Sequence, residues 1–228
     1  MCGIFGCVLA NGRAAPMIRT GLKKLEYRGY DSAGLATIYG GSIFVKKGKG
    51  KIDELHQELN FDDLPGAVGI GHTRWATHGA PSTVNAHPHL DCHGLVAVVH
   101  NGIIENFQRL REELEARGHV FKSRTDTEVI AHLIEEYLGM GKDLLQAVMD
   151  AAKRLKGSYA IAVIYSGEPD KIVVARNESP LVIGLGDGMN FVASDVAAFI
   201  EHTNRAIFLQ NGDVGVVTAD GVRLMRLE

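Results

Sequence analysis

Apolar runs divide the chain into short segments, and their spacing predicts both strands and helices. The first run covers residues 1–10 and combines β-branched residues with glycines, which is typical of a buried strand. Later runs predict strands at residues 35–39, 43–46, 67–73, 95–100, 159–165, 172–175, 181–185, 191–193, 206–209, 214–218 and 222–225. Several are apolar at consecutive positions, which indicates burial on both faces. Sheets enclosed between layers of helices would satisfy this pattern.

Helical spacing of apolar residues predicts helices at residues 14–27, 52–59, 143–155 and in the stretch that ends near residue 117. A further helix should start at Thr125-Asp126-Thr127-Glu128, which fits a capping box with Thr125 as N-cap and Glu128 reaching back. Ser194-Asp195 also fits a helix start. Residues 74–94 have no clear period and are rich in His, Pro and Thr. A loop of that length inside a compact domain is usually functional.

Composition narrows the class of protein. The 228 residues are 46% hydrophobic and 22% charged, with a net charge of −3, so nothing favours nucleic-acid binding. No apolar run approaches the roughly 20 residues that span a bilayer, and the N-terminal run lacks the basic segment of a signal peptide. Cys2 and Cys7 should point to opposite faces of one strand, and with Cys92 they predict free thiols. We expect one cytoplasmic domain.

Cys2 directly follows the initiator Met1. If Met1 is removed, Cys2 carries a thiol and a free α-amine on one residue. The reference pKa of an α-amine is about 7.7–8.0 and that of a thiol about 8.5, so the amine can accept the thiol proton near neutral pH. A cysteine at this position is weak evidence alone.

Three other groups have both a structural and a chemical interpretation. Arg74, with Thr77 and His78 close by, belongs either to a solvated loop or to a grip for a small carboxylic acid. Asn101-Gly102 is either a tight turn or an oxyanion hole made of the Asn101 amide and the Gly102 N–H. Asp126 either favours a helix N-terminus or binds an ammonium group.

The histidines raise the question of a metal. His87, His89, Cys92 and His93 could supply zinc ligands, and a metal-dependent hydrolase built on them is one alternative function. Their spacing matches no strong metal motif. We expect no metal and no cofactor.

Several motifs agree in order and spacing with one family. They are residues 2–6, 27–34, 72–79, 85–89, 100–106, 125–128 and 179–184, which together closely resemble the class II glutamine amidotransferases. The resemblance implies an α+β N-terminal-nucleophile hydrolase fold, a four-layer αββα sandwich with two mostly antiparallel sheets. It implies a glutaminase domain over residues 2–228, acting on L-glutamine.

The resemblance also implies roles for individual residues. Cys2 matches the nucleophile, with Asn101 and Gly102 as the oxyanion hole. Arg74 matches the group that holds the substrate α-carboxylate, assisted by Thr77 and His78, and Asp126 the group that holds the α-ammonium. Support or loop closure is expected of the remaining motif residues Arg28, Trp75 and His87.

Within this class, the pattern resembles the members whose glutaminase half precedes a C-terminal sugar-phosphate isomerase half, in enzymes expected to be homodimers. That half is absent from the 228 residues. Two alternatives stay open. The chain could be a silent glutamine-sensing module, if Met1 is retained, or its ammonia could serve another acceptor, such as a phosphoribosyl donor.

Overall fold

The computed structural model describes residues 2–228, apart from the side chain of Arg28. Met1, and with it the state of the Cys2 α-amine, lies outside this part of the chain. The supporting role expected of the Arg28 side chain also falls outside it.

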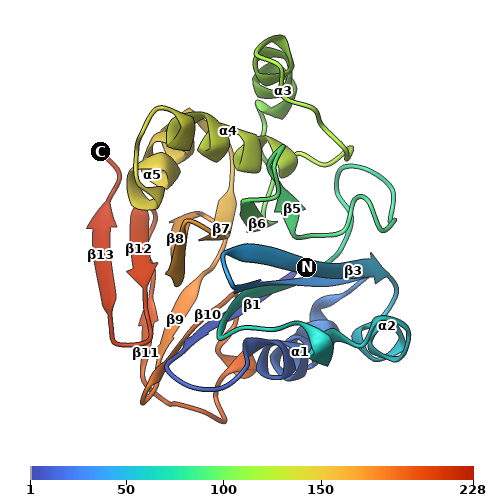
Figure 1. Ribbon diagram of the computed structural model, residues 1–228, viewed down its shortest axis with the longest axis vertical. Helices are drawn as coiled ribbons and strands as arrows, with labels where there is room; N and C mark the ends of the chain where they lie inside the picture. The colour runs from blue at the N-terminus through green and yellow to red at the C-terminus, as the bar shows by residue number, and fades with distance from the viewer. Residues whose placement is uncertain (1) are drawn as a thin grey trace.

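Two antiparallel sheets form the centre of the fold (Figure 1). The first sheet has seven strands in the order β11 (Ala206–Phe208), β9 (Val182–Leu185), β10 (Met189–Ala193), β1 (Gly3–Leu9), β4 (Val68–Arg74), β2 (Ser32–Tyr39) and β3 (Ser42–Lys49). The second has six strands in the order β13 (Val222–Arg226), β12 (Asp213–Val217), β8 (Glu168–Asn177), β7 (Tyr159–Tyr165), β6 (Val96–Asn101) and β5 (His89–Leu90).

Helices cover the outer faces of both sheets (Figure 1). Against the first sheet lie α1 (Ala14–Leu25) and α2 (Ile52–Leu59), with the 3-10 turns η1 (Glu26–Arg28), η2 (Phe61–Asp63) and η3 (Val196–Ala198). Against the second lie α3 (Phe107–Ala116), α4 (Glu128–Gly139) and α5 (Leu144–Arg154). The expected four-layer αββα sandwich is confirmed.

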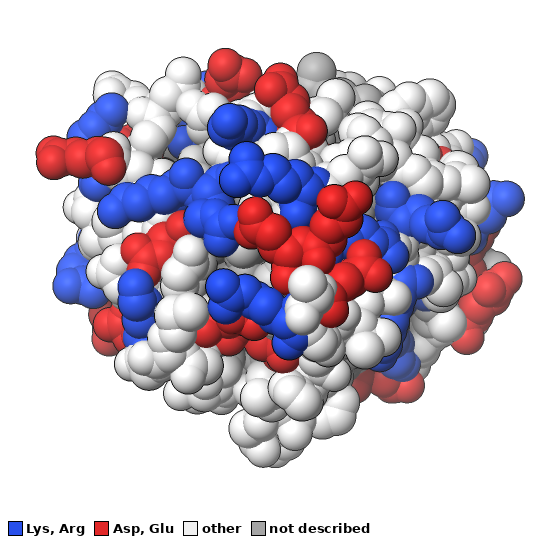
Figure 2. Space-filling model, turned by 90° about the horizontal axis from the view of Figure 1, so that it is seen from above, with Lys and Arg blue, Asp and Glu red and all other residues white. Residues whose placement is uncertain are grey.

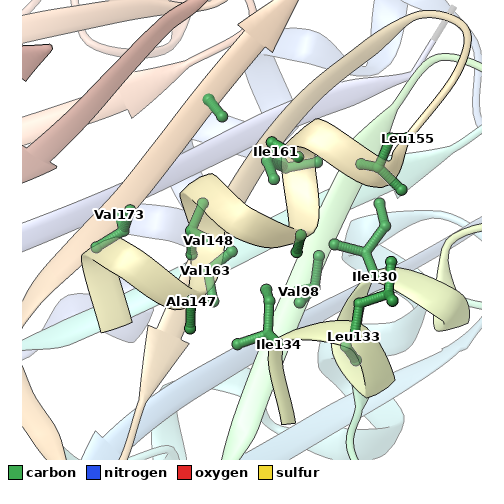
Figure 3. Close-up of a cluster of buried hydrophobic side chains, with 14 of the residues drawn as sticks. Val98, Ile130, Leu133, Ile134, Ala147, Val148, Leu155, Ile161, Val163 and Val173 are labelled. Atoms are coloured by element: carbon green, nitrogen blue, oxygen red, sulfur yellow. The ribbon is translucent and has the colours of Figure 1, made fainter. Parts of the chain in front are cut away.

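The double burial of the strands is visible in β7. Ile161 and Val163 pack against α4 and α5, as Figure 3 shows, whereas Ala160 and Ala162 belong to the apolar layer between the two sheets. Each residue of such a strand meets an apolar neighbour on one side or the other. This explains the consecutive apolar positions, because a strand exposed on one face would alternate instead.

Most predicted elements are present within a few residues of their expected bounds, but the capping box is wrong. Helix α4 begins at Glu128, with Thr127 as the N-cap and no side-chain capping bond. The Glu128 carboxylate accepts instead from the backbone N–H groups of Lys122 and Ser123. The Thr125 hydroxyl contacts His89 Nε2 at 3.0 Å. Tertiary partners therefore override the local motif.

No helix in the described part of the chain is long and apolar enough to cross a membrane. On the face seen in Figure 2, basic and acidic side chains are intermixed, and neither sign dominates. The three cysteines are free, as expected.

Candidate active site

A cavity of about 450 Å³ opens where the ends of the two sheets meet. Cys2 precedes β1, Arg74 ends β4 and Asn101 ends β6, so strands of both sheets bring their terminal residues to its wall. Gly102, Asp126 and other lining residues come from the segments that follow, including Trp75, Thr77, His87, His100 and Ser158. The structure therefore gathers around one cavity residues that range from Cys2 to Pro180 along the chain.

Cys2 lies in the cavity wall, half-buried. The backbone N–H of Trp75 donates to its Sγ at 3.0 Å, and the thiol lies 3.4 Å from the Trp75 carbonyl oxygen. Burial raises the pKa of the Cys2 thiol above its ordinary value, although the Trp75 N–H and the Arg74 charge act in the opposite direction. The thiol consequently needs a base to become a nucleophile near neutral pH.

The Asn101 amide lies directly against Cys2. Its Nδ2 donates to the Cys2 carbonyl oxygen at 3.1 Å. His72 fixes its orientation, because His72 Nε2 lies 3.1 Å from the His100 carbonyl oxygen and 2.9 Å from Asn101 Oδ1. A carbonyl can only accept, so Nε2 carries the hydrogen and the Asn101 atom beside it is the oxygen. The amide N–H groups therefore face Cys2.

Gly102 has a backbone that only glycine adopts easily, with φ at +119°. A Cβ at this position would lie 2.2 Å from the Ser158 carbonyl oxygen. The missing side chain thus keeps the backbone at the rim of the cavity, where the oxyanion-hole interpretation of Asn101-Gly102 requires it.

Arg74 is buried in the cavity wall and secures the loop that follows it. Its guanidinium donates to the carbonyl oxygens of His78 and Gly79, the latter at 2.9 Å. The contact of Nη1 with the Ala80 carbonyl oxygen is long, at 3.5 Å. Burial lowers the pKa of Arg74 from its ordinary value, while Asp31, Cys2 and Asp126 raise it. The side chain is therefore both a loop anchor and a cation at the cavity.

Asp126 also lies in the cavity wall, almost fully buried, with Oδ2 accepting from the Ile104 N–H at 2.8 Å. Thr77 lines the cavity as expected. His78 is not among the lining residues. Its Nδ1 is 4.0 Å from Asp126 Oδ1, and its ring meets Phe107 edge-on. His78 therefore lies beside Asp126, outside the cavity lining and too far from the carboxylate for a hydrogen bond.

Four buried histidines form the wall behind the cavity. His87 stacks on His72 with ring centroids 4.0 Å apart and touches His89 edge-on at 4.8 Å. The backbone N–H of His100 donates to His87 Nδ1 at 3.3 Å. Burial lowers the pKa of His72 to about 3, and it lowers the pKa values of His87 and His89 well below 6.5. These rings are neutral near pH 7.

The sequence interpretation missed several residues of this site. His72, His100, Ser158 and Ser179 contact or line the cavity, and His100 stands directly before Asn101 in the chain. Lys47 was also missed. Its Nζ donates to the carbonyl oxygens of Ala86 and Pro88 at 2.7 and 3.0 Å, which secures the loop that carries His87.

The proposed His87/His89/Cys92/His93 cluster does not form. Among the described residues, Cys92 groups instead with His119, His132 and Glu135.

The fold and the cavity define a glutamine amidotransferase class of domain, and comparison with known proteins agrees. The family described as "Glutamine amidotransferase domain" matches residues 59–217. The chain therefore belongs to this family.

Its curated relatives are more specific. The chain is 58% identical over 220 residues to glutamine–fructose-6-phosphate aminotransferase [isomerizing] of Pyrococcus horikoshii, covering 96% of this chain and 37% of that protein. It is 54% identical over 228 residues to the protein of the same name from Thermococcus kodakarensis, covering 100% and 38%. The chain thus spans less than two-fifths of the length of these relatives.

The solved structures agree at the level of the fold. Glutamine phosphoribosylpyrophosphate amidotransferase from B. subtilis superposes with a TM-score of 0.86 at 28% identity, covering 100% of this chain and 49% of that one. A class-II glutamine aminotransferase domain protein from Silicibacter pomeroyi has a TM-score of 0.65 at 14% identity, covering 100% of both chains.

Proposed function

We propose that this chain hydrolyses L-glutamine to glutamate and ammonia through a γ-glutamyl thioester on Cys2. The observation that carries the proposal is the composition of the cavity wall. It combines the Cys2 thiol with the Asn101 amide, the Arg74 cation and the Asp126 anion. An α-amino acid carries one carboxylate and one ammonium, so this pair of opposite charges complements its zwitterion.

The reaction follows from these positions. The Cys2 sulfur attacks the γ-amide carbon, and negative charge develops on the amide oxygen. The Asn101 amide and the Gly102 N–H donate to this oxygen. The C–N bond then breaks, and the nitrogen takes up a proton and leaves as ammonia. Water attacks the thioester and releases glutamate and the thiol. Arg74, with Thr77 and His78 assisting, holds the substrate α-carboxylate, and Asp126 holds the α-ammonium.

The base in this scheme is the α-amine of Cys2, which becomes available when Met1 is removed. The burial that raises the pKa of the thiol supports the need for a base on the same residue. Trp75, His87 and Arg28 are given supporting roles, the first two at the wall of the cavity.

The chain is proposed to act within a longer protein. Because the curated relatives carry the name glutamine–fructose-6-phosphate aminotransferase [isomerizing], we propose that residues 2–228 form the ammonia-supplying half of such an enzyme. A C-terminal sugar-phosphate isomerase domain would use the ammonia to convert fructose 6-phosphate to glucosamine 6-phosphate, in a homodimer. No cofactor enters the glutaminase reaction.

The test compares two cysteine variants in a glutamate and ammonia release assay. Cys2→Ala should abolish turnover yet still bind L-glutamine in calorimetry, because Arg74 and Asp126 remain. Cys7→Ala is the matched control, since Cys7 is buried in β1, the strand that directly follows Cys2, and faces the α1 side of the sheet. Full turnover by Cys2→Ala would refute the nucleophile. Intact-mass analysis of the active protein should show that Met1 is absent.

A further inference from the structure

Outside the cavity, one cluster of side chains has the composition and geometry of a metal centre. Cys92 lies in the turn after β5, His119 in the connection between α3 and α4, and His132 and Glu135 one turn apart on α4. One ligand atom from each residue lies within 4.8 Å of all the others. None of the four residues lines the glutamine cavity. From this cluster we infer a structural zinc site.

Five of the six distances between the ligand atoms lie within about 0.5 Å of those expected for tetrahedral coordination. With Zn–S near 2.3 Å and Zn–N or Zn–O near 2.0–2.1 Å, neighbouring ligand atoms should be about 3.6 Å apart for S and N, and about 3.3 Å for N and N or O. Cys92 Sγ lies 3.6 Å from His119 Nδ1 and 3.5 Å from His132 Nδ1. The two Nδ1 atoms are 3.0 Å apart, and Glu135 Oε1 lies 2.8 and 3.2 Å from them.

The far nitrogens of both imidazoles are held by carboxylates. His132 Nε2 lies 3.0 Å from Glu128 Oε2, and His119 Nε2 lies 2.5 Å from Glu136 Oε1. A carboxylate accepts, so each Nε2 is placed to donate a hydrogen to its carboxylate, which leaves Nδ1 of each ring as the atom that would bind a metal in the cluster. Metal-binding histidines are oriented in this way by a second carboxylate. Each ring is therefore held by a carboxylate at Nε2, with Nδ1 pointing into the cluster.

A shared proton is the alternative occupant of the space between the two rings. It would bridge the two Nδ1 atoms, and a protonated ring could also donate to Glu135 Oε1, which lies 2.8 Å from His119 Nδ1 and 3.2 Å from His132 Nδ1. A divalent cation contacts all four atoms at once, and a thiolate with a carboxylate balances its charge. Mixed sulfur, nitrogen and oxygen ligands in a tetrahedral set favour Zn²⁺ over Mg²⁺ or Ca²⁺.

The site has an entrance and a structural consequence. A surface pocket of about 390 Å³ is lined by Cys92, His119 and Glu135, so an ion can reach the cluster from solvent. Four protein ligands leave no position for a substrate, which is typical of structural zinc. The ion would tie the β5 turn and the α3–α4 connection to α4, which directly follows Asp126.

The test is a zinc titration of the chelator-treated 228-residue chain against a chromogenic chelator. We expect one Zn²⁺ per chain, an affinity that falls at least 100-fold in Cys92→Ser and His119→Gln, and a fall of about 10- to 100-fold in Glu136→Ala. His93→Gln is the matched control, because His93 is an exposed neighbour, 3.7 Å from Glu135. Binding should also persist in Cys2→Ala, which excludes capture by the other accessible thiol.

Cobalt substitution tests the geometry without any variant. Co²⁺ in the wild-type chain should give intense tetrahedral d–d bands and a thiolate charge-transfer band, and zinc should raise the unfolding temperature. A weak octahedral spectrum would overturn the assignment, and so would undiminished zinc affinity in Cys92→Ser. These readouts do not involve glutamine turnover, so they stand apart from the proposed function.

Discussion

Acid should destabilise this fold at a higher pH than carboxylate titration alone would predict, because of the histidine wall behind the cavity. Folding keeps His72, His87 and His89 neutral, with the pKa of His72 lowered to about 3 and the other two well below 6.5, chiefly by burial. Arg74 and Lys47 add electrostatic repulsion to a protonated ring at His89. In the unfolded chain the same residues titrate near pH 6.5.

The sign and size of the effect follow from linkage. Below pH 6.5 the unfolded state binds protons that the folded state excludes, so the free energy of unfolding falls as the pH falls. Each histidine whose folded pKa lies well below the pH of the experiment lowers the free energy of unfolding by RT ln(1 + 10^(6.5 − pH)), which is about 2 kcal/mol at pH 5. Three such residues contribute at most about 6 kcal/mol, against a typical total stability of about 5–15 kcal/mol.

Urea unfolding followed by far-UV circular dichroism at pH 7.5, 6 and 5, with a chelator present, measures this loss. His87→Phe keeps a ring stacked on His72 but removes one titrating group, so it should lose about 2 kcal/mol less than the wild type between pH 7.5 and 5. His93→Gln, a change at an exposed histidine, should lose as much as the wild type. Equal losses in His87→Phe and the wild type would refute the buried-neutral assignment. Carboxylates interfere little in this window, since their pKa values in the unfolded chain, about 3.9–4.3, lie below pH 5, and the folded pKa of Glu128 is lower still, at about 2.

Two further predictions concern the chemistry of the cavity. Asn101→Ala should lower kcat by about 10²–10³-fold with little change in glutamine affinity, and His72→Phe should lower kcat by less, because the amide remains but its orientation is lost. Stopped assays over a range of glutamine concentrations separate kcat from KM. An unchanged kcat in Asn101→Ala would contradict the oxyanion role. Asp126→Asn should weaken glutamine binding by about 30-fold or more, as expected for one side of a buried charge pair, and calorimetry in the Cys2→Ala background would contradict this if the affinity were unchanged.

The sequence predicts the sheets well because their physical signal is local. Runs such as Tyr159–Tyr165 are apolar at every position, and only burial on both faces accommodates such a run. The start of α4 was misassigned for the opposite reason. Thr125 and Glu128 have the spacing of a capping box, but their partners are His89 and the backbone at residues 122–123. No local pattern contains those contacts.

The candidate site could be predicted only where a motif marks it. Cys2, Arg74, Asn101, Gly102 and Asp126 line one cavity, in keeping with the resemblance. His72 lies within the motif of residues 72–79, but the sequence assigns it no role, because only the structure brings its ring to the Asn101 amide. The cysteine and histidine cluster was equally hidden. The i,i+3 spacing of His132 and Glu135 was visible, but only the packing of α4 brings Cys92 and His119 to it.

The Cys2 sulfur proposed to attack the substrate and the Asn101 amide proposed to stabilise the developing charge stand at the ends of strands from opposite sheets. Their separation is therefore set by the thickness of the apolar layer between those sheets, formed by residues such as Ile4, Ile70 and Val99. A shift of about 1 Å in reacting groups can slow an enzyme by about 100-fold. The packing of this apolar layer therefore sets the distance between the two groups as well as stabilising the fold. Sequence drift there is constrained by geometry, even at positions that no ligand ever touches.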